Sequence, residues 1–193
     1  MRRAWRGSVV VLSAVLTAAG LCRPAAAIDL TKTWEVGGGL VNTTHDNDST
    51  MNDVLGWEAR GGYHFNKYHG VELTYQVEST DSNQQNANTT FDTQKYTLSY
   101  VATLKNKKPD SKISPFIDLS VGQFHYSNGD ASEKSTVVQV GGGVRYFFTK
   151  SWALRFQGDL WHWHGDKVIV PRHGFFAFDL AIGVSYVFGK GGA

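Results

Sequence analysis

Cysteine is almost absent from this chain, since Cys22 is the single one among 193 residues. Disulfides within the chain are therefore excluded, although many small secreted domains depend on them. Proline is also scarce, with four residues, and no long helical period of apolar residues runs through the sequence. The chain is instead rich in glycine, with 21 residues, and in aromatic residues, which make up 13% of it. This composition predicts an all-β protein.

The first residues predict export from the cytoplasm. A basic start, MRRAWRG, precedes the apolar run from Val9 to Leu21, and small residues follow at Ala25 and Ala27. These three regions are typical of a secretory signal peptide, so we expect residues 1–27 to be removed. A membrane-spanning anchor is the weaker alternative, because the apolar run falls short of the ~20 residues that a spanning helix needs.

Cleavage after Ala27 would also remove Cys22, which stands inside the predicted signal peptide. A lipid anchor on this cysteine is disfavoured because Leu21 stands where such anchors need a small residue. The mature domain, residues 28–193, then contains no cysteine and has the length of one domain.

Basic charge is not in excess in the mature chain. Removing the four arginines of the signal peptide lowers the 19 basic residues to 15, against 17 acidic residues, which gives a net charge of −2. Nucleic-acid binding is not expected, because it needs a basic face or stripe.

Apolar and polar residues alternate along eight segments of the mature chain, which is the pattern of half-buried strands. In VELTYQVE, for example, Val71 and Leu73 alternate with Glu72 and Thr74. The predicted strands are 33–44, 54–65, 70–79, 91–105, 115–127, 135–148, 152–164 and 175–188. Each is close to or longer than the ~9–11 residues with which a tilted strand crosses a bilayer.

The connections between these segments alternate in character. Those after the odd-numbered strands are long or polar, for example HDNDSTMND and STDSNQQNANTT. Those between them are NKYHG and TKS, which are short, and KNKKPDSKIS, which is longer and basic. Outer loops, inner turns and both termini on one side predict an eight-stranded antiparallel up-and-down β-barrel that crosses a membrane.

The polar face of the strands decides which side points inward. It carries small residues at strand centres, where a water-facing exterior has no use for them: Gly37, Gly39, Gly62, Gly122, Gly141, Gly143, Ala181 and Gly183. It also carries charges of both signs: Glu35, Glu58, Arg60, Glu72, Lys95, Asp118, Arg145, Arg155, Asp159 and Asp179. A crowded barrel interior needs small residues, and opposite charges there can satisfy one another. We therefore predict a lumen filled by a charge network of these residues.

The apolar face carries aromatic residues near the strand ends, at Trp34, Trp57, Tyr63, Phe65, Tyr146, Phe148, Trp152, Tyr186 and Phe188. Such a girdle marks the two interfaces of a membrane, so we predict lipid outside the barrel. The alternative is a lipocalin-like barrel, in which the apolar face points inward around a small ligand.

Two runs, VVQVGGGVRYFFTKSWALRFQGDLWHWHG and FDLAIGVSYVFG, resemble the second half of the OmpA-type small outer-membrane β-barrel proteins. The shared features are a glycine-rich strand, the strand end GVRYF, the turn TKSWALR and a closing strand that ends in an aromatic residue. The resemblance implies a place in the outer membrane of a Gram-negative bacterium and insertion by the barrel-assembly machinery. It also implies contact with outer-membrane lipid and lipopolysaccharide. Its motifs are architectural, and they imply neither a catalytic activity nor a cofactor.

The stretch FHYSNGD, residues 124–130, contains groups that could perform chemistry. In a strand without a bulge, His125 and Ser127 would face lipid near the outer leaflet, on the same face as Leu119 and Val121. The pair locally resembles the His-x-Ser-Asn motif of lipid A deacylases, outer-membrane esterases in which the histidine activates the serine. This activity is the alternative function.

Two features disfavour an esterase. The motif of that family lies near the end of the chain, whereas three predicted strands follow it here. A carboxylate that would orient the base is missing at the expected spacing, and Glu133 is the one acid nearby. The competing interpretation is a bulge in the strand, which would turn Phe124 and Tyr126 outward and place His125 and Ser127 in the lumen.

Two further patterns could bind a metal ion, and neither is expected to do so. His162 and His164 share a strand face, but LWHWHGD is better explained by tryptophans and histidines at a membrane interface. Asp46, Asp48 and Asp53 lie in the first outer loop without the spacing of a calcium loop.

The sequence thus predicts a non-enzymatic outer-membrane barrel whose lumen is plugged by its own side chains. Its function would lie in the outer loops, in adhesion, surface protection or envelope integrity. A partner that binds these loops is expected, and no motif in them identifies it.

Overall fold

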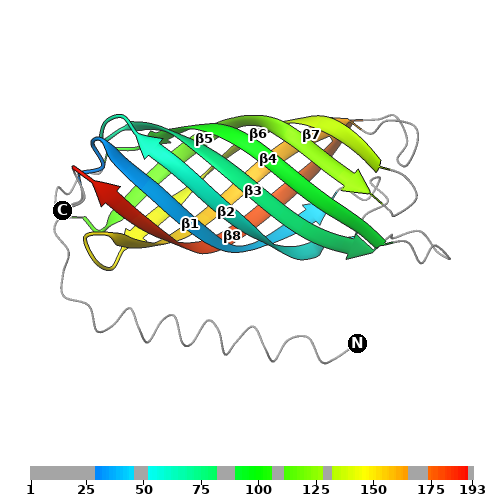
Figure 1. Ribbon diagram of the computed structural model, residues 1–193, viewed down its shortest axis with the longest axis horizontal. Coiled ribbons are helices and arrows are strands. Elements are labelled where there is room, and N and C mark those ends of the chain that lie inside the picture. The colour runs from blue at the N-terminus through cyan, green and yellow to red at the C-terminus, as the bar shows by residue number, and fades with distance from the viewer. Residues whose placement is uncertain are drawn as a thin grey trace, which may run out of the picture.

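The computed structural model describes residues 29–45, 52–81, 90–105, 111–127, 132–164 and 174–190 (Figure 1). Its strands are β1 Thr33–His45, β2 Val54–His64, β3 His69–Asp81, β4 Thr90–Thr103, β5 Ile113–Ser127, β6 Ser132–Phe147, β7 Trp152–His164 and β8 Gly174–Gly189. Every predicted strand coincides with one of these, and the ends differ by at most three residues. Within the described residues, no helix is long and apolar enough to cross a membrane.

The strands close into a barrel in chain order, with every neighbouring pair antiparallel. The barrel is completed by β1 and β8, whose pairing runs from Thr33 opposite Gly189 to His45 opposite Ala177. Closure gives each strand two hydrogen-bonded neighbours, so that no unpaired edge is left facing lipid. The predicted fold class, an eight-stranded antiparallel up-and-down barrel, is confirmed.

The two ends of the barrel differ in their connections. The start of β1 and the end of β8 lie at the same end, which we call the inner end (Figure 1). The turns 65–68 and 148–151 lie there as well, and β4 ends and β5 begins at this end. At the opposite end, which we call the outer end, β1, β3, β5 and β7 end and the strands that follow them begin. The segments between strands have four, nine and four residues at the inner end and eight, eight, four and nine at the outer end.

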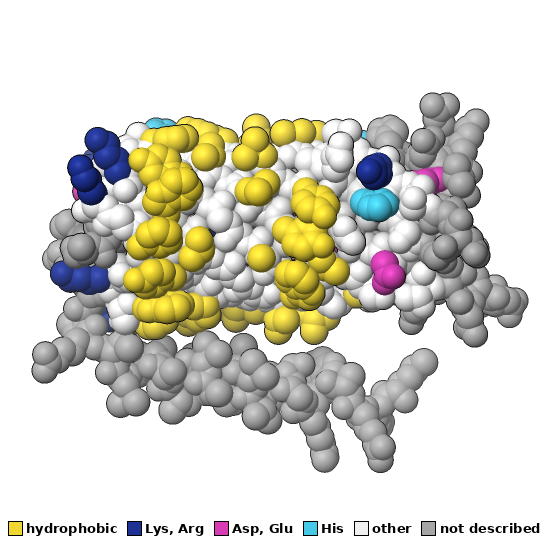
Figure 2. All heavy atoms as spheres, viewed as in Figure 1, with side chains coloured by type: hydrophobic (Ala, Val, Ile, Leu, Met, Phe, Trp, Pro, Cys, Tyr) yellow, Lys and Arg dark blue, Asp and Glu magenta, His cyan; other side chains and the backbone are white. Residues whose placement is uncertain are grey.

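Alternation along the strands separates two environments. Leu98 is 56% exposed on the outside of the wall, whereas its neighbour Ser99 is 4% exposed in the lumen and accepts a hydrogen bond from Ser120. The outside is covered with apolar side chains in bands around the barrel (Figure 2). This placement excludes the lipocalin-like alternative, because the apolar face points away from the lumen.

Candidate functional site

The lumen is filled with charged and polar side chains. All ten residues of the predicted charge network are buried there, each at most 7% exposed: Glu35, Glu58, Arg60, Glu72, Lys95, Asp118, Arg145, Arg155, Asp159 and Asp179. They come from every strand of the barrel, so that their side chains meet only once the barrel has closed. Burial of so many charges is tolerable only where they are paired or hydrogen-bonded.

The inner half of the lumen is organised around two arginines. Arg155 makes a two-pronged contact with Glu72, through Nη1–Oε2 at 2.5 Å and Nη2–Oε1 at 2.8 Å. Arg145 Nε lies 3.0 Å from Oε2 of Glu35, and Nη1 of Arg155 is 3.7 Å from Oε1 of that carboxylate. Both guanidinium groups also stack on the ring of Phe116, at 4.3 and 4.4 Å from its centroid. Such planar, forked contacts are the strongest that arginine makes with carboxylates.

The outer half of the lumen is organised around Asp179. This carboxylate forms an ion pair with Lys95 and accepts hydrogen bonds from Thr43 Oγ1 at 2.7 Å and from Trp161 Nε1 at 3.0 Å. Lys95 Nζ lies 4.3 Å from the centroid of the Trp161 ring, so the ammonium group also makes a cation–π contact. The charge of Asp179 is therefore well compensated.

Carboxylates outnumber cations in the described part of the lumen. Asp159 and Asp118 flank Gly141 on the two neighbouring strands. The amide of Gln157 donates to Asp159 at 2.9 Å and to Asp118 at 3.4 Å, and neither carboxylate has an ion-pair partner within 4.0 Å among the described residues. A side chain at Gly141 would overlap the Asp159 carboxylate, so the glycine provides the space that this group occupies.

Sequence reasoning missed four members of the lumen network. Glu78 accepts a hydrogen bond from Gln76 and contacts the hydroxyl of Thr43, and Glu133 accepts a hydrogen bond from the hydroxyl of Tyr126. His64 Nε2 lies 2.9 Å from Oε2 of Glu35, and Gln157 bridges the two aspartates. Three of them could have been found from the sequence. Glu78, His64 and Gln157 lie an even number of positions from predicted lumen residues on the same strand, so they share the face that points into the lumen.

Clusters of buried apolar side chains lie at both ends of the lumen. The outer cap is formed by Phe124, Tyr126, Val137, Trp161, Trp163, Phe175 and Ala177. The inner cap is formed by Leu30, Phe147, Ala153 and Val187. The interpretation of LWHWHGD as part of a membrane belt is wrong for both tryptophans, which are at most 1% exposed. They alternate with the outward-facing Leu160, and they fill the outer mouth of the barrel.

The predicted bulge in β5 is also wrong. Its pairing with β4 and β6 runs through the segment without an inserted residue. Phe124 and Tyr126 are therefore in the lumen, at 1% and 0% exposure, and the partly exposed His125 and Ser127 lie on the outer wall. The two aromatic residues point into the lumen, where their rings make edge-to-face contacts with the tryptophans of β7 in the outer cap.

An acid that the sequence analysis did not consider lies on the same wall. Asp92 of β4 is directly opposite Ser127, and Gln94 is opposite His125. Only the register of two strands brings Asp92 there, because it precedes the motif by more than 30 residues. Glu133, the acid considered from the sequence, instead faces the lumen.

These wall residues do not form a catalytic relay in this structure. Nε2 of His125 has no hydrogen-bond partner, so it does not contact the hydroxyl of Ser127. The carboxylate of Asp92 accepts a hydrogen bond from Ser79 Oγ at 2.9 Å. A nucleophilic serine needs a base within hydrogen-bond reach and a third group that orients the base. The structure brings the three residue types to one face without these contacts.

The candidate metal ligands are not brought together in the part of the chain that the structure describes. No group of three or more His, Cys, Asp or Glu side chains there could hold a metal ion. The ring of His162 packs against Phe176 on the outer wall, with centroids 4.9 Å apart. Asp46, Asp48 and the side chain of His164 lie outside the described residues, and Asp53 accepts a hydrogen bond from the backbone of His45.

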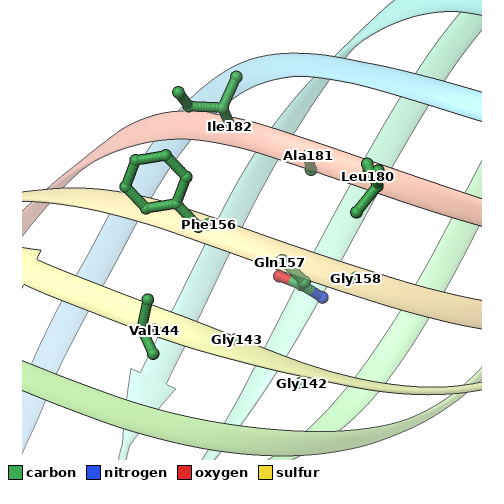
Figure 3. Close-up of a pocket in the computed structure, with 9 residues that line it drawn as sticks. All are labelled: Gly142, Gly143, Val144, Phe156, Gln157, Gly158, Leu180, Ala181 and Ile182. Carbon is green, nitrogen blue, oxygen red and sulfur yellow. The ribbon is translucent and has the colours of Figure 1, made fainter.

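A shallow hollow of about 420 Å³ lies in the wall between β6, β7 and β8 (Figure 3). It exists because Gly142 and Gly158 are paired across two strands and place no side chain on the outer surface. Its rim includes the outward-facing Val144, Phe156 and Leu180. Because this face is apolar, acyl chains of the surrounding lipid can fill the hollow.

Comparison with known proteins agrees with this architecture. The profile of a family described as "Outer membrane protein beta-barrel domain" matches residues 13–188. No curated protein matches the sequence.

Several solved structures share the fold. Neisserial surface protein A is 15% identical with a TM-score of 0.56, and the match covers 81% of this chain and 96% of that chain. OprG from Pseudomonas aeruginosa is 13% identical with a TM-score of 0.58, covering 83% and 97%. Ail, the attachment invasion locus protein of Yersinia pestis, is 14% identical with a TM-score of 0.53, covering 82% and 99%. At these identities the similarity extends to the fold alone.

Proposed function

Because the chain belongs to the outer membrane protein β-barrel domain family, we propose that this outer-membrane protein is a closed, non-enzymatic barrel that acts through its outer loops. The loops would serve envelope integrity, adhesion or surface protection, and they would bind a partner outside the cell. The barrel itself would hold the loops at the membrane surface and let nothing through.

The filling of the lumen by buried side chains is the observation that supports this proposal. An eight-stranded barrel is just wide enough for its own side chains. Here the Arg155–Glu72 pair and the Lys95–Asp179 pair reach across the lumen, between apolar caps at both ends. If nothing passes through the barrel, the loops are the part of the protein that can interact with other molecules. Loops on a rigid scaffold often carry function.

The route to the membrane is part of the same proposal. The signal peptide would be cleaved after Ala27, and the mature chain would begin at Ile28, which the mass of the protein isolated from outer membranes would reveal. The barrel-assembly machinery would insert it among lipopolysaccharide and phospholipid. Leu30, the third residue after the predicted cleavage site, contributes to the inner cap and is 2% exposed. The start of the mature chain therefore supports closure of the lumen.

Ion conductance tests the closed lumen. The native protein in a planar bilayer should give no single-channel current, because charged side chains fill the path between the two caps. The double variant Glu72→Ala, Arg155→Ala removes one ion pair and keeps both caps and the Lys95–Asp179 pair, so it should give no current either. A steady current through the native protein would contradict the proposal.

The second candidate function is deacylation of lipid A. It is supported by the outward orientation of His125 and Ser127 and by the position of Asp92 opposite Ser127. It ranks second because Nε2 of His125 makes no hydrogen bond. A free imidazole can take the wrong tautomer or rotamer, which leaves the serine weakly nucleophilic.

Mass spectrometry of lipid A distinguishes the two functions. Expression of the native protein in a host with unmodified lipid A should leave the lipid A mass unchanged, and Ser127→Ala should give the same spectrum. An acyl chain that is lost with the native protein and retained with Ser127→Ala would establish an esterase. The main proposal would then be wrong.

A further inference from the structure

Lysine side chains surround the inner end of the barrel. Outside the lumen, the described residues carry lysines at this end at positions Lys32, Lys67, Lys105, Lys112, Lys150 and Lys190. All are exposed except Lys112, which is partly exposed, and none forms an ion pair among the described residues. Figure 2 shows basic side chains at this end, immediately beyond an apolar band. We call these residues the lysine ring.

The charge of this end is not balanced by nearby acids. Within the described residues, Asp29 is the acidic side chain at the inner end, and it accepts hydrogen bonds from Thr31. The outer end differs, because its described exposed charges are Lys134, Asp53 and Asp92. The barrel therefore presents a positive inner rim in a mature chain whose net charge is negative.

The lysines stand close to aromatic residues along the chain. Lys32 precedes Trp34 by two positions, Lys67 follows Phe65 by two, and Lys190 follows Phe188 by two. These lysines lie in turns and bends beyond the strand ends, where Lys32 has a φ of 55° and Gly189 one of 122°, so the period of two does not extend to them. Their exposure and their closeness to the outward-facing aromatic residues place them at the rim of the barrel wall, outside the lumen.

This placement sets the depth of the lysine ring in the membrane. Trp34, Trp152 and Phe188 are 40–51% exposed on the outer wall at the inner end. Aromatic girdles lie at the level of the lipid headgroups. Lysines one step beyond the girdle reach the phosphates of those headgroups, and long basic side chains extend readily to this depth.

We propose that the lysine ring binds the anionic headgroups of phospholipids in the leaflet that faces the periplasm. Lysines next to an anionic membrane surface are attracted to it over a distance of about a Debye length. A lipid is a better match than a cell-wall polymer below the barrel, because the lysines stand next to the aromatic residues of the lipid-facing wall. The ring would fix the depth of the barrel and select its lipid neighbours.

Lipid retention tests this inference. The mature protein is purified in the presence of equal amounts of phosphatidylglycerol and phosphatidylcholine with the same acyl chains, and the retained lipids are quantified. We expect a several-fold excess of phosphatidylglycerol over phosphatidylcholine, which falls as the salt concentration rises. The quadruple variant Lys32→Gln, Lys67→Gln, Lys150→Gln, Lys190→Gln should retain the two lipids in the input ratio. Lys134→Gln, at the outer end, is the matched control and should keep the excess.

Three results would overturn the inference. The native protein could retain both lipids equally, or the quadruple variant could keep the full excess. The variant could also lose co-sedimentation with isolated cell wall while its lipid preference stays unchanged, which would assign the lysine ring to the wall polymer. The salt titration uses the native protein and does not depend on how well the variant folds. None of these readouts measures conductance, so the proposed closed lumen is tested separately.

Discussion

Replacing Glu35 by Gln is expected to lower the free energy of unfolding by about 3–5 kcal/mol, the cost of removing one partner of a buried ion pair. Glu35 is 1% exposed, and its carboxylate contacts Arg145, Arg155 and His64. Arg155 would keep Glu72 as its counter-ion. Arg145 would not, because its Nη1 and Nη2 have no hydrogen-bond partner and its Nε contacts Glu35. The variant thus leaves a guanidinium group buried without an anion.

Asp159→Asn is the matched control for this prediction. Asp159 is 5% exposed and has no ion-pair partner within 4.0 Å among the described residues, while Gln157 donates to it at 2.9 Å. An asparagine oxygen can accept that hydrogen bond, so we expect a change of no more than about 1 kcal/mol. Urea unfolding of both variants in lipid vesicles measures the difference. Equal destabilisation of the two variants would mean that the Glu35 cluster contributes nothing beyond ordinary burial.

Replacing Leu98 by Arg is expected to hinder folding into lipid by about 2–4 kcal/mol, the cost of an arginine on the lipid face near the bilayer midplane. Leu98 is paired with Leu73 and Val121, which face lipid as well, so the new charge would have no polar neighbour across the strands. The folded fraction in vesicles of increasing thickness measures this effect, because a thicker hydrocarbon core leaves less water within reach of the arginine.

Ser99→Arg is the control that places the same large, charged side chain on the lumen face of β4 instead of the lipid face. This residue is one position further along β4 and points into the lumen beside Ser120 and Asp118. An arginine there would be destabilising through crowding, and its cost should be independent of bilayer thickness. If Leu98→Arg folded normally and the protein stayed soluble without detergent, the assignment of the lipid face would be wrong.

Much of the wall could be predicted from the sequence. Side chains alternate between the two faces of each strand, and a closed barrel has only an inside and an outside. Once the face that points inward is known, the side of the wall on which every side chain lies is known as well. Small and charged residues on one face, such as Gly141 and Arg145, and aliphatic residues on the other, such as Val140 and Val144, were enough for that assignment. The same parity placed Phe124 and Trp161 in the lumen. A preference for aromatic residues at membrane interfaces led to the opposite interpretation, which packing of these rings against one another in the outer cap overrode.

The contacts between strands could not be predicted in this way. Glu35 on β1 contacts Arg145 on β6, and Lys95 on β4 contacts Asp179 on β8, across the width of the lumen. The position of Asp92 opposite Ser127 likewise depends on the register between β4 and β5. Strand parity is a local property that each segment carries alone, and it determined which side chains are inside. Register and closure depend on all eight strands at once, and only they decided which of those side chains meet.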